Sequence, residues 1–456
     1  MARAVMSLAS LYEHSLMESR SMTRVHSVLL ATLAIGAARA ASDAQKPPPV
    51  HFIDRPVATS KHEFRGLSGI RQLPNGTILV NDALRKQLLL LDTAFNTVRV
   101  VADSTPGSEN AYGPSQGGIL PYPGDSTLFV LPRVPSMYMI DPAGKIVRVM
   151  AVPRPAEAAS MGSNFNGVPG IDAKGRWVYR GQTPPATRTP VVPGGPPGIM
   201  TSVDSGPIVR VDLTTHAFDT VAMFKLLPLK GKIYPRGEGR TLAMIESNPV
   251  PMVDDWAVLS DGSIAIVRGQ DYHVDFVNKD GSMTHGPKMA YAWEPLGDDA
   301  KIALIDSMKK ADADSRKESA TQTTVSSGSG SSAASSGGGR SGGGGLSASG
   351  PPADLPPGEF PSAADLPDYR PPFTINSVKP DADGHLWIRT THREPSAGTV
   401  YDVVSREGKV IDRVQLQPGR AIAGFGKGGI VYILARDDSG GWIEKAIWHA
   451  PSPPAF

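Results

Sequence analysis

The 456-residue chain contains no cysteine. This absence excludes disulfide bonds, thiolate metal sites, a cysteine nucleophile and lipidation at an N-terminal cysteine. A protein exported without disulfide bonds has to be stabilised by its core alone, and a chain of this length can bury a sufficient core.

The chain also lacks a long hydrophobic run. Its main apolar stretch, residues 28–38, is about half the ~20 residues that a membrane-spanning helix needs, so we expect no membrane span. Arg20 and Arg24 precede this stretch and Ala38-Arg39-Ala40 follows it, which is the pattern of a cleavable signal peptide. We therefore predict a signal peptide over residues 1–40, starting at Met1 or Met22, and a soluble periplasmic or secreted protein.

Clusters of basic residues are absent as well. Without residues 1–40, the chain has 42 basic and 42 acidic residues, and its formal charge is zero. A neutral chain of this kind is not expected to bind the phosphate backbone of nucleic acids. We expect a monomer.

A strand-turn-strand pattern with a glycine in the turn recurs along the rest of the chain. The turns lie at Asn75-Gly76, Gly124-Asp125, Lys174-Gly175, Asp261-Gly262, Asp383-Gly384 and Gly428-Gly429. Asn-Gly and Asp-Gly between apolar runs are strong hairpin signals. The uninterrupted spacings of 44 to 51 residues match the ~40 to 50 residues of a four-stranded propeller blade and disfavour a β-sandwich.

The pattern thus predicts an all-β fold: a single six-bladed β-propeller over residues 41–456, closed by an N-terminal strand within residues 50–57. The segment Val-Lys-Pro-Asp-Ala-Asp-Gly-His-Leu-Trp-Ile, residues 378–388, resembles a blade of the six-bladed propellers of the NHL and TolB-like type. This resemblance implies the fold and no particular reaction.

Two insertions interrupt the repeats. Residues 183–207 are rich in proline and glycine, which predicts a loop insertion within the third unit. Residues 295–372 begin with a short helix that has Ile302, Ile305 and Met308 at helical spacing. They continue into a Ser/Gly-rich tract, 326–350, for which we expect disorder.

Motifs that suggest chemistry are weak. The glycines of residues 424–429 precede a strand and not the helix that a dinucleotide site needs. His273 and Asp275 would share one face of a strand and could bind a metal, but the sequence names no further ligand. Some propeller lactonases hold a divalent ion through Glu, Asn and Asp of different blades. Glu63, Asn166, Asn376 and Asp255 are candidates for such roles, although the flanking motifs of that family are absent.

Arginine recurs near the end of the strand after the turn in five of the six units: Arg133, Arg180, Arg268, Arg389 and Arg436. Propeller symmetry would place them around one mouth of the channel. Either each arginine pairs with a nearby acid, such as Asp254, Asp255, Asp271 or Asp437, or several converge on an anionic ligand.

We therefore predict a binding module for an anionic small molecule, a glycan or an envelope protein, without a catalytic or metal site. The predicted ligand-binding residues are the five arginines with Asp254, Asp255, Asn166 and Asn376. The alternative is a metal-dependent hydrolase or lactonase, or a lyase, in the same channel. No cofactor is expected, apart from the divalent cation of that alternative.

Overall fold

The computed structural model describes residues 47–105, 107–108, 110–192, 195–236, 240–326, 356–391, 398–437 and 440–451. The chain divides into two compact units, Met1–Pro47 and Pro48–Phe456, and the description below concerns the second. The predicted signal peptide and, beyond Ser326, the predicted disordered tract lie outside the described residues. No helix in the described residues is long and apolar enough to cross a lipid bilayer.

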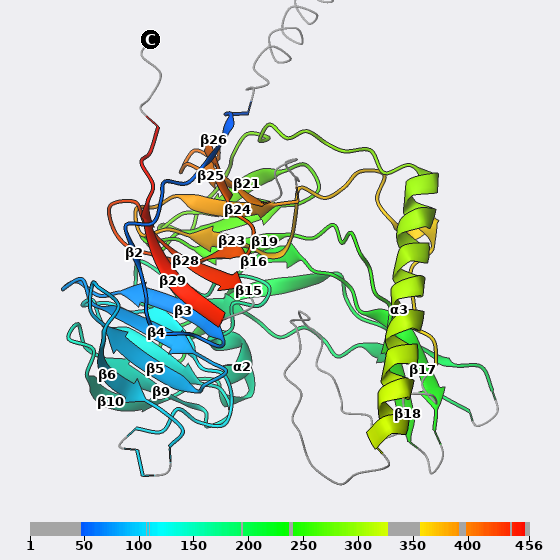
Figure 1. Cartoon of the computed structure of the whole chain (residues 1–456), viewed down its shortest axis with the longest axis horizontal. Coiled ribbons are helices and arrows are strands. Elements are labelled where there is room, and N and C mark those ends of the chain that lie inside the picture. The colour runs from blue at the N-terminus through cyan, green and yellow to red at the C-terminus, as the bar shows by residue number, and fades with distance from the viewer. Residues whose placement is uncertain are drawn as a thin grey trace, which may run out of the picture. The chain divides into compact units, whose positions relative to one another are not determined.

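The second unit consists mainly of antiparallel β-strands in seven sheets (Figure 1). Six sheets follow one another along the chain, and we number them 1 to 6. Sheet 1 contains β3 (Leu67–Gln72), β4 (Ile78–Asp82), β5 (Gln87–Leu91) and β6 (Thr97–Ala102). Sheet 2 contains β7 (Gly118–Pro121), β8 (Thr127–Leu131), β9 (Ser136–Ile140) and β10 (Ile146–Ala151). Sheet 3 contains β11 (Gly170–Ile171), β12 (Trp177–Arg180), β15 (Ser205–Val211) and β16 (Phe218–Lys225).

The C-terminal half of the chain forms the next three sheets. Sheet 4 contains β19 (Asp255–Val258), β20 (Ile264–Arg268), β21 (His273–Val277) and β22 (Met283–His285). Sheet 5 contains β23 (Phe373–Pro380), β24 (Leu386–Thr390), β25 (Thr399–Val404) and β26 (Val410–Leu416). Sheet 6 contains β27 (Arg420–Phe425), β28 (Ile430–Asp437) and β29 (Gly440–Ile447). The predicted all-β class and the four-stranded antiparallel sheets are confirmed.

The core lies between these sheets because alternate side chains of a strand point to opposite faces. On β4, Leu79 packs against sheet 2, while Ile78 and Val80 pack in a cluster with Tyr432 and Ile443 of sheet 6. Further clusters of buried side chains join sheets 2 and 3, 3 and 4, 4 and 5, and 5 and 6. Each of the six sheets therefore shares buried side chains with two others.

The predicted glycine turns join the first two strands of each sheet. Their form has a local cause, because an acid at the start of several turns accepts backbone N–H bonds from the residues that follow it. Asp381 accepts such bonds from Asp383 at 2.9 Å and His385 at 2.7 Å, and Gly384 between them has a φ of 100°. That backbone conformation is open to glycine and strained for most other residues.

The segment before sheet 1 contributes to two sheets. The closing strand was predicted within residues 50–57, but the strand that pairs with β29 as the fourth strand of sheet 6 is β2 (Ala58–Thr59), just after that segment. The earlier strand β1 (Val50–Phe52) pairs in parallel with β26 and becomes a fifth strand of sheet 5. This second pairing was not predicted.

The insertion at residues 183–207 lies between the second and third strands of sheet 3, as predicted, but it is not a plain loop. This segment contains β13 (Thr187–Arg188), β14 (Gly198–Thr201) and the start of β15. The first two strands join β17 (Lys230–Pro235) and β18 (Thr241–Ile245) in a seventh sheet, which we call the insertion sheet. Pro190, Gly195, Pro196 and Pro197 lie in the connection between β13 and β14, so the composition marked a turn inside a sheet.

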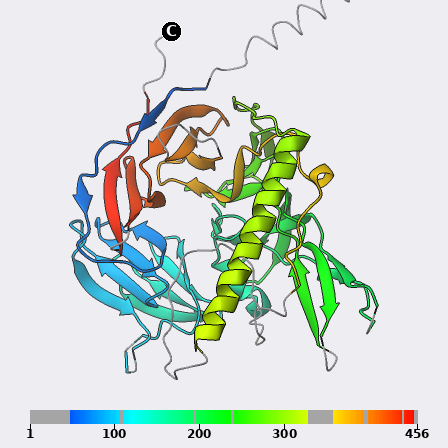
Figure 2. The same cartoon turned by 45° about the vertical axis from the view of Figure 1, so that its right-hand side comes forward.

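Four helical segments complete the described structure: η1 (Pro155–Glu157), α2 (Ala158–Met161), α3 (Asp298–Ser326) and η3 (Ala363–Asp365). Helix α3 is longer than predicted, and Figure 2 shows it near the hairpin of β17 and β18. Ile305 is buried with Leu296, Val250 and Leu366, whereas Ile302 is exposed. The segment Gly358-Glu359 links helix α3 to the hairpin of β17 and β18. The carboxylate of Glu359 contacts Lys232 of β17 at 2.9 Å, and Gly358 donates its backbone N–H to Asp312 of α3.

Candidate ligand-binding site

The predicted arginines lie at one edge of sheets 2 to 6, which we call the arginine edge. Arg180 and Arg268 are the last residues of β12 and β20, and Arg389 is the last but one of β24. Because the strands are antiparallel, the first strand of each sheet starts at this edge: Asp255 of β19 pairs with Val267, next to Arg268. Tertiary structure therefore brings the predicted acids and arginines to the same edge.

The insertion sheet and helix α3 are also connected to the arginine edge. The segment with β13 and β14 leaves after Arg180 and returns where Gly181 donates its N–H to Pro207 at 2.9 Å. The hairpin of β17 and β18 connects β16 to β19, and the N–H of Asp254 there bonds Lys225 at 3.0 Å. Helix α3 lies in the connection from β22 to β23, which starts at this edge.

Asn166, Asn376 and Asp255 form one connected group across sheets 3, 4 and 5. The side-chain oxygen of Asn376 accepts the backbone N–H of Asn166 at 2.8 Å, and both asparagines have positive φ angles. The carboxylate of Asp255 accepts the backbone N–H groups of Ser377 and Val378 at 2.8 and 3.1 Å. Asp255 thereby joins sheet 4 to sheet 5.

Asp255 is almost completely buried. Burial raises its pKa to about 6, although its three backbone hydrogen bonds act in the opposite direction. Because both oxygens already accept N–H bonds, this carboxylate serves the structure of the edge.

Arg268 has its charge neutralised within sheet 4. Its guanidinium contacts Asp254 at 2.8 Å and Asp275 at 2.7 Å, and both carboxylates are nearly buried. Asp254 also accepts the backbone N–H groups of Lys225 and Gly269. These contacts support a structural role for Arg268, in which it pairs with nearby acids and does not bind a ligand.

Arg180 and Arg389 differ from Arg268, because neither has an ion pair or a side-chain hydrogen bond in the described part of the chain. Both are partly buried, and burial lowers the pKa of Arg180. Lys379 of β23 adds a third cation: burial lowers its pKa most, the charge of Arg389 lowers it further, and Asp255 acts against this shift. Arg389 and Lys379 therefore lie close enough for their charges to interact, and Asp255 is the acid that acts on Lys379.

Arg133 and Arg436 are exposed. Neither side chain has an ion pair or hydrogen bond with any described residue. In sheet 1, Asn81 and Asp82 occupy the corresponding position and are buried: Asn81 bonds Tyr112 and Gly117, and Asp82 bonds the N–H groups of Arg65 and Gly66. The five arginines thus have three different environments and do not form one uniform group.

Glu63, considered as a possible metal ligand, lies 3.5 Å from Arg85 and is half exposed. Asp255 and Asn376 use oxygens for the backbone bonds described above, so the lactonase-like set is not arranged as free ligands.

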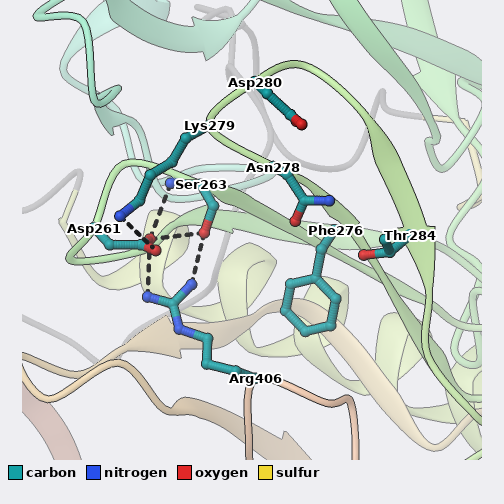
Figure 3. Close-up of a pocket in the computed structure, with 8 residues that line it drawn as sticks. All are labelled: Asp261, Ser263, Phe276, Asn278, Lys279, Asp280, Thr284 and Arg406. Carbon is teal, nitrogen blue, oxygen red and sulfur yellow. Dashed lines mark hydrogen bonds and ion pairs between the residues drawn. The ribbon is translucent and has the colours of Figure 1, made fainter.

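A surface cavity of about 490 Å³ lies at the opposite edge, where sheets 4 and 5 have their turns (Figure 3). It contains none of the predicted site residues. Both of its basic side chains contact Asp261, Arg406 at 2.8 Å and Lys279 at 3.5 Å, and Arg406 also contacts the hydroxyl of Ser263 at 2.6 Å. Burial alone would raise the pKa of Asp261, but hydrogen bonds from Ser263 and Arg406 lower it to about 2.

Sequence reasoning missed Lys379 as a member of the edge. Its only local signal was a basic residue in the first strand of the fifth unit, three residues after Asn376. The proximity to Arg389 depends on the pairing of Lys379 with Trp387, which spacing alone did not reveal.

Comparisons with known proteins show no family. No family model and no curated protein matches the chain. Among solved structures, virginiamycin B lyase from Staphylococcus aureus with quinupristin is 9% identical, with 86% of this chain and 98% of that chain covered and a TM-score of 0.34. A gluconolactonase from Xanthomonas campestris is 10% identical, with 88% and 99% covered and a TM-score of 0.34. A member of the DUF4221 family from Bacteroides vulgatus is 10% identical, with 88% and 96% covered and a TM-score of 0.40. Similarities at this level of identity and TM-score support no conclusion about the function of this chain.

Proposed function

We propose that residues 41–456 form an exported six-bladed β-propeller of the NHL or TolB-like type that binds an anionic small molecule at its arginine edge. Sheets 1 to 6 are its blades. The support is the cycle of shared cores, in which sheet 6 packs with sheet 1 as well as with sheet 5. Strand β2 adds the N-terminal segment to sheet 6, and this pairing supports the proposed closure of the ring.

The insertion sheet is an addition to the ring and not a seventh blade. Its strands come from two excursions, one inside sheet 3 and one between sheets 3 and 4. None of its buried residues belongs to the six clusters that join neighbouring sheets.

Export is the second part of the proposal, and it depends on the signal-peptide pattern of residues 1–40. N-terminal sequencing of the protein from culture medium or periplasm should give residue 41 first. Retention of residues 28–38 in that product would contradict export by cleavage.

The observation that carries the binding proposal is that Arg180 and Arg389 have no counter-charge among the residues that the structure describes. A cation removed from water without a counter-charge is costly, so a bound anion would stabilise this edge. Arginine also offers two parallel N–H donors that match a carboxylate or phosphate group. The ligand class is therefore a small carboxylate- or phosphate-bearing molecule, and Asn166 and Asn376 are polar groups on the same edge.

The test is the thermal stability of the mature protein in increasing concentrations of citrate and phosphate. Ligand binding to the folded state raises the melting temperature by mass action. R180A and R389A should weaken anion binding by about 1.5 to 3 kcal/mol for each charged hydrogen bond lost, and R389K should weaken it too because lysine lacks the fork.

The matched control is R436A, which removes an exposed arginine from the equivalent position of sheet 6. It should respond to anions as the wild type does. Equal responses in wild type, R180A, R389A and R436A, or no response in the wild type, would contradict binding at Arg180 and Arg389.

A further inference from the structure

A second group of polar side chains lies on the outer strands of sheet 4. His273 and Asp275 are two residues apart on β21, so they share one face of the sheet. Asp275 pairs across the ladder with His285 of β22, which places the second histidine on that face too. The ligand atoms of these three side chains all lie within 4.8 Å of one another.

Both imidazoles approach the same oxygen atom. Nε2 of His273 lies 3.1 Å from Oδ1 of Asp275, and Nδ1 of His285 lies 2.6 Å from that oxygen. The other oxygen of Asp275 accepts the N–H of Arg268 at 2.7 Å. Asp275 is nearly buried, whereas His285 is 68% exposed and leaves the group open to solvent.

Asp271 determines which nitrogen of His273 is available. It lies 2.6 Å from Nδ1 of His273, so a neutral imidazole donates its N–H to Asp271 and carries a lone pair on Nε2. That lone pair faces an oxygen of Asp275, and two acceptors at this distance repel one another unless a proton or a metal ion lies between them. A carboxylate that holds the second nitrogen of a histidine is the usual support of a metal-ligating histidine.

The local charge also suits a cation. Asp254, Asp271 and Asp275 carry three negative charges, and the basic groups in contact with them are Arg268 and Lys288. With neutral histidines, the group has a net charge of −1. In a metal site the ligand atoms stand about 2.0 to 2.2 Å from the ion, so the atoms would move apart slightly. The exposed side chain of His285 has room for that movement.

We propose that His273, Asp275 and His285 bind a divalent transition-metal ion through Nε2, Oδ1 and Nδ1, with Asp271 as a positioning residue. Two imidazoles and one carboxylate are ligands suited to zinc and its neighbours in the first transition row, with the remaining coordination positions open to water. The proposal is independent of anion binding, because it concerns other side chains.

The experiment uses untagged mature protein, stripped with EDTA and dialysed into chelator-free buffer. Zn²⁺ binding is followed by calorimetry, and Co²⁺ binding by its visible absorption, which reports direct ligation by the protein. The wild type should bind one ion per chain. H285A should lower the affinity at least about 10-fold. D271N, which removes the carboxylate that supports His273 together with one negative charge, should lower it about 10- to 100-fold.

The matched control is H449A, because His449 is exposed, and this variant should bind the ion as the wild type does. His285 is exposed as well, so H285A should fold normally and circular dichroism can verify this. Absence of Zn²⁺ and Co²⁺ binding in the wild type would overturn the proposal. Equal binding by wild type, H285A and D271N would overturn it also.

Discussion

Sheet 4 and its neighbours, sheets 3 and 5, place an arginine at the same edge and treat its charge differently. Arg268 of sheet 4 lies between two nearly buried carboxylates, whereas Arg180 of sheet 3 and Arg389 of sheet 5 have no acidic partner among the described residues. A repeated position in a repeat protein can therefore serve the structure in one repeat and remain available for a ligand in the next. Which role an arginine has depends on the acids that neighbouring strands place beside it.

The largest effect is expected for R268A. Removal of this guanidinium leaves Asp254 and Asp275 without their main counter-charge, and loss of one partner of a buried ion pair is costly. Both acids keep other hydrogen-bond donors, so we expect the free energy of unfolding to fall by about 2 to 3 kcal/mol. Urea denaturation measures this loss.

R180A and R389A, measured in the same anion-free buffer, provide the comparison for R268A. They should be neutral or slightly stabilising, because each removes a cation that has no counter-charge among the described residues. A loss in either variant as large as that of R268A would show that these arginines have structural partners and would remove the contrast between the sheets.

Asp255 provides a comparison with the acids that pair with Arg268, because it joins sheets 4 and 5 through hydrogen bonds to backbone N–H groups. Its folded-state pKa of about 6 lies above the ordinary value of 3.8. The protonated form therefore favours folding: this contribution is complete below about pH 4 and is lost as the pH rises through about 6. In D255N the amide cannot ionise, and it should lose one of the three backbone bonds at a cost of about 1 to 2 kcal/mol.

The measurement is the free energy of unfolding of wild type and D255N at about pH 4.5 and about pH 7.5. The wild type should exceed D255N by more at the lower pH. A difference that grows as the pH rises would mean that Asp255 is stabilised in its ionised form, and that the nearby cations already have their counter-charge.

The smallest effect is expected for R406A at the opposite edge, where the cavity lies. Arg406 and Asp261 are each about one-third exposed, and ion pairs in such positions contribute about 1 kcal/mol or less. R406A should leave the anion response of the protein unchanged, as measured by the same thermal titration. A lost response would place the anion site in the cavity and not at the arginine edge.

The local pattern of the sequence predicted the strands and turns of the six sheets well. Continuous apolar runs such as those of β4 and β20 supply two buried faces. Turns such as Asp381–Gly384 require glycine for reasons of backbone conformation alone. Interactions of this kind involve residues close in sequence. The proline- and glycine-rich segment at 183–207 misled the prediction of a loop, because β13 pairs with β14 and β14 in turn pairs with β17, whose residues lie 29 to 35 positions further along the chain.

The roles of the arginines were decided by tertiary structure alone. Spacing placed Arg180, Arg268 and Arg389 at one edge, but equal spacing does not reveal that Asp254 and Asp275 flank only Arg268. Similarly, the sequence by itself paired His273 with Asp275, whereas His285 joins them through the ladder between β21 and β22. Charge neutralisation and metal ligation act over a few ångströms in space, and they depend on which distant residues the fold brings together.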